Sequence, residues 1–99
     1  MKSVQEIIEK SKPHPNGVEG ARQIVLYNDK VRMSIVGGSK GLYGDFLEDF
    51  EIAFLDQETN DFVTRFYSPN NDDDVIGYVP GLQMLDLINR VFIKGFQVQ

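Results

Sequence analysis

Two stretches of the sequence show the alternation of apolar and polar residues that is typical of a half-buried β-strand. In residues 31–36 and 49–55, apolar residues recur at every second position, and polar residues such as Arg32 and Glu51 lie between them. The regularly spaced apolar residues are Val31, Met33, Ile35, Phe50, Ile52 and Phe54. Successive side chains of a strand point to opposite faces, so each stretch should bury one face and expose the other.

Two further strands complete a pair of predicted hairpins. Arg22–Tyr27 precedes the first alternating stretch and is joined to it by a short turn at residues 28–30. Phe62–Tyr67 follows the second stretch after a turn at residues 57–60. Short turns favour antiparallel neighbours, so these four strands predict a meander. The apolar segment Val75–Val79 is short, and we expect it to be extended.

A short helix is predicted before the strands, over residues 3–12. Ser3 and Glu6 have the spacing of a capping box, in which each side chain accepts a hydrogen bond from the other residue's backbone N–H. Residues 13–17 contain two prolines and a glycine, which end the helix.

A longer helix is predicted after the strands, over Leu82–Ile93. Pro80 lies where a helix commonly begins, and Gly95 lies where one commonly ends. The apolar residues with helical spacing are Leu82, Leu85, Ile88, Val91 and Phe92. This stripe should pack on the apolar face of the sheet, which places Leu85 and Ile88 against the third strand.

The predicted elements define a single α+β domain over residues 1–99. Its sheet is antiparallel, with about four strands in two hairpins, and it packs with the C-terminal helix and a short N-terminal helix. The chain has 99 residues, of which 41% are hydrophobic and 25% charged, as in an ordinary globular domain. That length supports one hydrophobic core.

Composition excludes several classes of protein. The chain has no cysteine, which excludes disulfides and thiolate metal sites. The apolar runs are too short to span a bilayer, and residues 1–12 lack the apolar segment of a signal peptide. We therefore expect a cytoplasmic protein that is not inserted in a membrane.

The charge is distributed unevenly along the chain. The net charge is −5, and residues 41–74 alone contain ten Asp and Glu residues with Arg65 as their only basic residue. A chain this acidic does not bind nucleic acid directly through bulk electrostatics. Such a surface is suited to a basic protein partner, including one that itself binds nucleic acid.

The sequence contains no recognisable catalytic or metal-binding pattern. His14 is the only histidine and lies between two prolines. The glycine-rich residues 37–44 match no phosphate-binding motif, and residues 70–74 match no register of a calcium loop. We therefore predict a protein that is not an enzyme, with no metal and no cofactor.

The candidate partner-binding residues are one aromatic residue of the glycine-rich loop and the acidic residues of the predicted second hairpin and its approaches. They are Tyr43, Asp45, Glu48, Asp49, Glu51, Asp56, Glu58 and Asp61. Concentrating like charges costs folding free energy through repulsion, which favours a functional role. A surface that only increases solubility is the alternative interpretation.

Part of the chain resembles a known group of proteins. The segments are Ser34–Gly38, Gly41–Asp45, Phe50–Ala53 and Asp74–Val79. They are similar to small uncharacterised proteins encoded by tailed bacteriophages. The resemblance covers residues 34–79 and implies a small protein that binds a host or phage component stoichiometrically, in the host cytoplasm.

Three hypotheses for function follow. The first is a non-enzymatic acidic protein-binding module, a phage-encoded inhibitor or modulator that engages a basic protein surface. The second is a structural or assembly module that forms a homo-oligomer or part of a larger particle, with Val63, Tyr67 and Tyr78 as its contact patch. The third is a small-ligand binder or enzyme that uses the glycine-rich loop.

Overall fold

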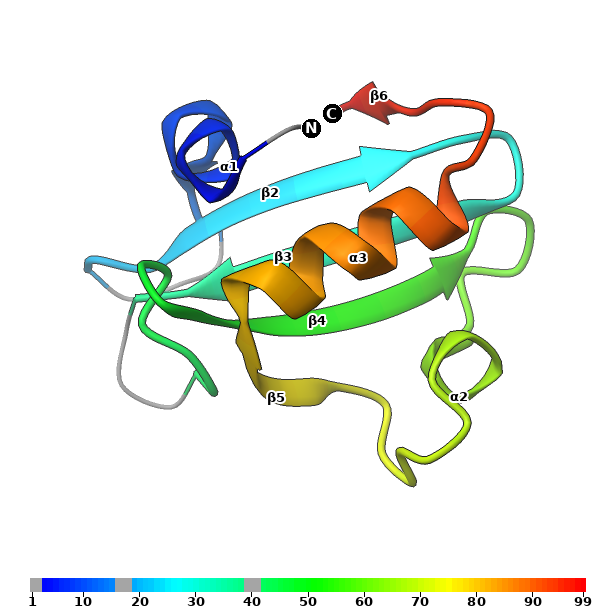
Figure 1. The fold of residues 1–99 in the computed structure, drawn as a ribbon. Helices are drawn as coiled ribbons and strands as arrows, with labels where there is room; N and C mark the ends of the chain where they lie inside the picture. Colours follow the sequence, from blue (N-terminus) through cyan, green and yellow to red (C-terminus); the bar gives the residue numbers. More distant parts are fainter. Residues whose placement is uncertain (1–2, 16–18, 39–41) are drawn as a thin grey trace.

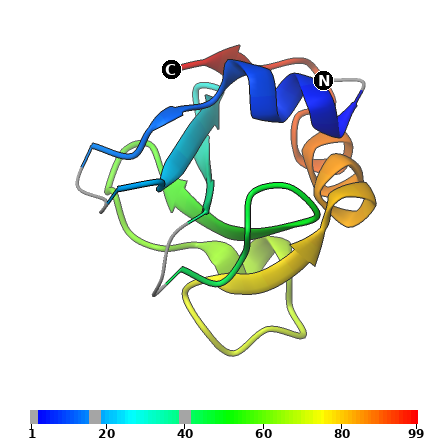
Figure 2. The same cartoon turned by 90° about the vertical axis from the view of Figure 1, so that its left-hand side faces the viewer.

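The fold is a curved antiparallel sheet whose inner face is covered by helices α1 and α3 (Figures 1 and 2). The computed structural model describes residues 3–15, 19–38 and 42–99. The elements are α1 (Val4–Lys10), β1 (Lys12–Pro13), β2 (Arg22–Tyr27), β3 (Val31–Gly37), β4 (Asp49–Asp56), α2 (Thr64–Tyr67), β5 (Ile76–Pro80), α3 (Gly81–Val91) and β6 (Gln97–Val98). The predicted α+β class is confirmed.

The sheet has more strands than the sequence predicted. Within the described residues the sheet has six strands: five follow the order β1-β2-β3-β4-β5, and the sixth, β6, also pairs with β2. One additional strand is β5, whose segment was predicted to be extended and which pairs with β4. The other two are edge strands of two residues each, which are too short to give a periodic signal in the sequence. Both edge strands lie on the same side of β2: Lys12 pairs with Gln23, and Val98 pairs with Leu26.

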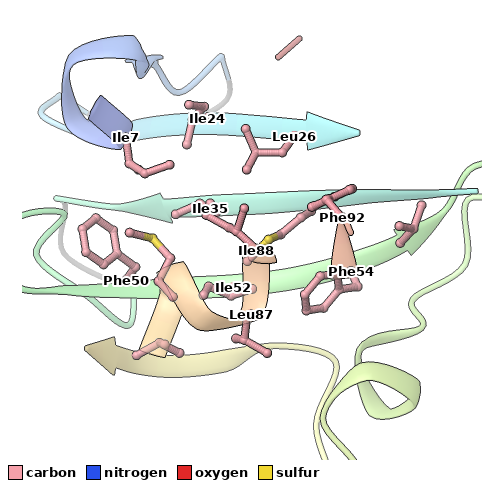
Figure 3. Packing of buried hydrophobic residues seen from close by; sticks show 14 of the residues in the cluster. Ile7, Ile24, Leu26, Ile35, Phe50, Ile52, Phe54, Leu87, Ile88 and Phe92 are labelled. Carbon is pink, nitrogen blue, oxygen red and sulfur yellow. The ribbon is translucent and has the colours of Figure 1, made fainter. Parts of the chain in front are cut away.

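The core lies between the inner face of the sheet and the two helices (Figure 3). Ile24, Ile35 and Ile52 are paired in register across three strands, and all three are buried. Ile7 of α1 and Ile88 of α3 close the space over this row, and both are buried. The alternation of residues 31–36 and 49–55 therefore faces the core as predicted.

Helix α3 forms as predicted but is rotated relative to the predicted apolar stripe. Met84, Leu87 and Ile88 are its buried residues, whereas the Leu82 side chain is 81% exposed. The expected core residue Leu85 is only partly buried at the edge of the core.

The start of α3 explains this rotation. The helix begins at Gly81, directly after β5, and the Gly81 N–H donates to the Glu48 carbonyl at 3.1 Å. A Cβ at Gly81 would lie 2.6 Å from Val4 Cγ2, so the first turn of α3 lies against α1. These contacts fix the rotation of the helix, and local periodicity could not reveal them.

The predicted fourth strand, Phe62–Tyr67, is wrong. Only an isolated bridge between Phe62 and Leu55 forms, and the chain then makes the single turn of α2. The buried Thr64 hydroxyl accepts the Phe54 N–H at 3.0 Å and donates to the Asp74 carbonyl at 2.6 Å. This anchoring replaces strand pairing, and β4 takes β5 as its second neighbour. The second hairpin of the predicted meander is therefore absent.

Candidate functional site

The predicted acidic residues do not form one surface, because most of them lie at the two ends of β4. Asp45, Glu48 and Asp49 lie at the beginning of this strand, whereas Asp56 is its last residue. Seven residues of extended chain span about 23 Å. Glu58 and Asp61 follow Asp56 in the loop beyond, so the acidic residues form two groups at opposite ends of the strand.

Exposed aromatic side chains lie near each of these groups. We call the surface at the beginning of β4 the tyrosine end; it comprises Tyr43, Asp45, Leu47, Glu48, Asp49 and Tyr78. We call the surface beyond its last residue the phenylalanine groove; it is lined by Asp29, Lys30, Asp56, Glu58, Val63, Phe66 and Tyr67. In Figure 1 the groove end is marked by α2, and the tyrosine end lies where β4 begins.

The tyrosine end presents two aromatic rings side by side. The ring centroids of Tyr43 and Tyr78 are 5.9 Å apart, and the rings are tilted by 60°. The Tyr78 N–H donates to the Tyr43 carbonyl at 2.7 Å, which joins the two segments through their backbones. Tyr43 is 50% exposed and Tyr78 is 62% exposed, so much of this pair faces solvent.

A β-bulge places Tyr78 in this position. Phe50 pairs with Val79 and Ile52 with Ile76, so Gly77 and Tyr78 together stand opposite Glu51. Tyr78 has φ +52°, a left-handed conformation that costs a residue with a side chain about 1–2 kcal/mol. The bulge thus turns a bulky side chain outward at an energetic cost.

Gly77 is required beneath the tyrosine pair. A Cβ at this position would lie only 2.8 Å from Tyr43 Cβ, closer than such atoms approach in proteins. The absence of a side chain therefore allows Tyr43 to lie directly on β5. The sequence feature behind this contact is the Gly77-Tyr78 pair. It indicates a close approach of another segment only once the β-bulge is known.

Two of the predicted acidic residues build the loop that precedes β4. Asp45 Oδ1 accepts the backbone N–H groups of Leu47, Glu48 and Asp49 at 2.8, 2.9 and 3.2 Å. Asp49 Oδ1 in turn accepts the Asp45 N–H at 2.8 Å. The backbone donors lower the pKa of Asp45 to about 2. These two carboxylates therefore stabilise the loop, while the Glu48 side chain is exposed beside them.

The same loop is fixed to the core by Phe46. This residue is buried, has φ +62°, and its ring centroid lies 5.1 Å from that of Phe50. Gly44 allows the close approach, since a Cβ there would lie 2.8 Å from Phe50 Cα. Leu47 is consequently held at the exposed tip of a well-anchored loop.

Glu51 has a different environment from the other acidic residues. It lies half-buried on the outer face of the sheet, and burial raises the pKa of its carboxyl group. A hydrogen bond from the Tyr43 backbone N–H and the nearby His14 lower that pKa and partly oppose the effect of burial. The Glu51 carboxyl group therefore helps to hold the Tyr43 segment in place by accepting this hydrogen bond. The position of His14 between two prolines does not indicate that this residue lies close to the strand.

The phenylalanine groove has an apolar floor and a charged rim. Its volume is about 350 Å³, and Val63, Phe66 and Tyr67 supply the apolar surface. Phe66 is 80% exposed, and its ring centroid lies 5.4 Å from that of Tyr67. The Tyr67 ring packs in turn on Phe54, at 4.8 Å. The floor is thus continuous with the core.

Asp56 organises the rim of the groove. Its Oδ1 accepts the backbone N–H groups of Glu58 and Thr59, both at 2.9 Å, and these donors lower its pKa. Burial and the negative charge of Asp56 raise the pKa of Tyr67. Asp61, in contrast, is exposed in the same loop but does not line the groove.

The contact patch predicted for an assembly module is not brought together. Val63 and Tyr67 pack against the core, because the turn of α2 directs them inward. Tyr78 belongs to the tyrosine end, at the other end of β4. Phe66 of α2 and Phe62, which precedes the helix, are the exposed apolar side chains here.

Other candidate chemistry finds no cluster in the described residues. Among residues 3–15, 19–38 and 42–99, no three His, Asp or Glu side chains are grouped so that they could hold a metal ion. No helix within these ranges is long and apolar enough to cross a bilayer. Lys40, the cation of the glycine-rich loop, lies outside the described residues.

Comparisons with protein families, with curated proteins and with solved structures find no match to this chain.

Proposed function

We propose that this chain is a non-enzymatic protein-binding module and that the tyrosine end binds a basic segment of its partner. The single observation that carries the proposal is the Tyr43–Tyr78 pair, which is exposed and held by a backbone hydrogen bond near the beginning of β4. Rigid tyrosines supply large contact area at little cost in side-chain entropy. A conformation that disfavours folding and displays an aromatic ring is typical of a functional surface.

The chemistry of the partner follows from the two rings and from the charges of the loop that precedes β4. A lysine or arginine over an aromatic face gains about 0.5–2 kcal/mol. Asp45 stays ionised at neutral pH because its pKa is about 2, and the exposed Glu48 adds a second carboxylate. Charges of this sign accelerate association with a basic surface and disfavour acidic competitors.

The resemblance of residues 34–79 to small phage proteins supports a more specific role. A phage-encoded inhibitor or modulator would occupy the basic surface of a host protein stoichiometrically. A net charge of −5 suits a protein that competes with nucleic acid for such a surface.

Capture from a bacterial lysate with immobilised variants tests the proposal. The double variant Tyr43→Ser/Tyr78→Ser removes both rings, and Ile93→Ser is the control at another exposed apolar residue. A partner should be retained by the wild type and by Ile93→Ser. The double variant should bind it at least about thirtyfold more weakly, as expected when binding hot spots are lost.

A charge-reversed pair tests the electrostatic part separately. Glu48→Lys and Glu9→Lys change the net charge equally, and both residues are exposed. Glu48 is preferred to Asp45 or Asp49 because its side chain does not cap the loop. Glu48→Lys alone should slow association, and the wild-type rate should fall as salt increases. If no captured protein distinguishes the tyrosine double from Ile93→Ser, the proposal is wrong.

A further inference from the structure

The phenylalanine groove contains a large aromatic side chain that the fold leaves exposed to solvent. Phe66 lies in the single turn of α2, and the neighbouring Val63 and Tyr67 are partly buried against the core. Phe66 is nevertheless 80% exposed, and Phe62 is also exposed nearby. Exposed aromatic surface next to a concave site marks a binding surface more often than a scattered apolar residue does.

This surface is held in place by the core. Thr64 is buried and anchors the start of the turn to both Phe54 and Asp74. The Arg65 side chain donates to the Asp72 carbonyl at 2.6 and 2.9 Å, which ties the exposed side of the turn to the following loop. A partner would therefore meet a preformed site, which reduces the ordering cost of binding.

The charged side chains at the rim of the groove determine which charge a bound segment should have. Asp29, Asp56 and Glu58 contribute three carboxylates, and Lys30 contributes one cation. The hydrogen bonds that lower the pKa of Asp56 keep it ionised. A second copy of this chain, with a net charge of −5, is electrostatically unfavourable in such a site.

We propose that the phenylalanine groove is a second docking site, for a protein segment in which a large apolar side chain is flanked by lysine or arginine. The apolar side chain packs on Phe66, Val63 and Tyr67, and the flanking cations face the rim. The volume of about 350 Å³ is at the lower end of the range for ligand sites, which suits one or two side chains. The chain would then contact basic partner segments at both ends of β4.

Two synthetic peptides of the same length test this inference by NMR. The probes are acetyl-Lys-Leu-Phe-Leu-Lys-amide and its charge-reversed form acetyl-Glu-Leu-Phe-Leu-Glu-amide, titrated to millimolar concentration into the ¹⁵N-labelled chain. The basic peptide should shift the backbone amides of Glu58, Val63, Phe66 and Tyr67 saturably. The acidic peptide should leave them unchanged.

Two variants and a control connect the shifts to the groove. Phe66→Ser should weaken binding of the basic peptide at least about tenfold, and Glu58→Lys should weaken it more at low salt than at high salt. Ile93→Ser should bind like the wild type, and the amide spectrum of each variant shows whether it is folded.

Three outcomes would overturn the inference. The first is a spectrum in which neither peptide, or both equally, shifts the groove amides. The second is a set of shifts restricted to Tyr43 and Tyr78, which would leave the proposed function standing while the groove proposal fails. The third is a shift of the groove amides with protein concentration alone, because that would assign the surface to self-association.

Discussion

The tyrosine end and the phenylalanine groove present aromatic rings by opposite means. At the tyrosine end the displayed residue itself has an unfavourable backbone conformation, with φ +52° at Tyr78. At the groove the displayed Phe66 lies in ordinary helical backbone, and the unusual feature is the buried hydroxyl of Thr64. Exposed aromatic surface can thus depend either on strain at the surface or on a polar anchor in the core.

The largest expected effects come from the two phenylalanines of β4 that support these surfaces. Phe50→Ala and Phe54→Ala should each lower the free energy of unfolding by about 3–5 kcal/mol, because both side chains are fully buried. Phe50 contacts Phe46 in the loop of the tyrosine end, and Phe54 contacts Tyr67 in the groove.

Urea unfolding measures the loss, and hydrogen exchange locates it. Exchange should accelerate most in the loop around Phe46 for Phe50→Ala and in α2 for Phe54→Ala. Equal acceleration at both ends in both variants would show that the two surfaces are not independently supported.

The hydroxyl of Thr64 gives the next largest effect. Thr64→Val should cost about 1–3 kcal/mol, since it leaves the buried Phe54 N–H without its acceptor. Thr64→Ser retains the hydroxyl and should keep the amide shifts of α2 close to the wild type. The amides of Tyr43 and Tyr78 should be unaffected in both variants; a large shift there would contradict the separation of the two ends.

The order of stability of the glycine and alanine variants should be opposite at the two exposed aromatic residues, Tyr78 and Phe66. Tyr78→Gly should be more stable than Tyr78→Ala by about 1 kcal/mol, because alanine retains the strain of a positive φ. Phe66→Gly should be less stable than Phe66→Ala by about 1 kcal/mol, because glycine disfavours the helix. Urea unfolding of the four variants checks the comparison, and the same sign at both residues would refute it.

The smallest effect concerns the pH dependence of the Asp45 loop. The pKa of Asp45 is lowered from 3.8 to about 2, so its ionised form stabilises the fold above pH 3.8 and this contribution disappears as the pH falls to 2. Asp45→Asn should melt at a lower temperature than the wild type at neutral pH, and the difference should shrink over that interval. Carbon-detected NMR titration of the carboxyl group checks the pKa directly, and an ordinary value would remove the basis for the difference.

The sequence predicted those elements whose burial follows one local period. The strands around Met33 and Ile52 have a regular alternation, and the structure pairs them as expected. The helix after Pro80 was also predicted, but its rotation depends on where Gly81 meets α1, which is a tertiary contact. The predicted apolar stripe of this helix therefore included Leu82, which is exposed in the structure.

The remaining differences come from polar groups that act locally. Alternation in residues 62–67 fits a strand, but Thr64 supplies a buried donor and acceptor that favours a turn. The acidic residues before β4 were predicted as partner contacts, whereas Asp45 and Asp49 also hold their own loop together. The spacing of these two aspartates around a loop was the available signal, since Asp side chains commonly bind backbone N–H groups in turns.

The pairing of two short strands along one side of β2 has a consequence for aggregation. β2 contains the apolar run Ile24–Leu26, and its outer backbone groups are covered by β1, by β6 and by the Gln99 N–H, which donates to the Val25 carbonyl at 2.9 Å. An uncovered strand of this composition can recruit the same strand of another molecule into a growing intermolecular sheet. Residues 97–99 therefore cover this edge of the sheet, and their detachment would turn it into a template for fibrils.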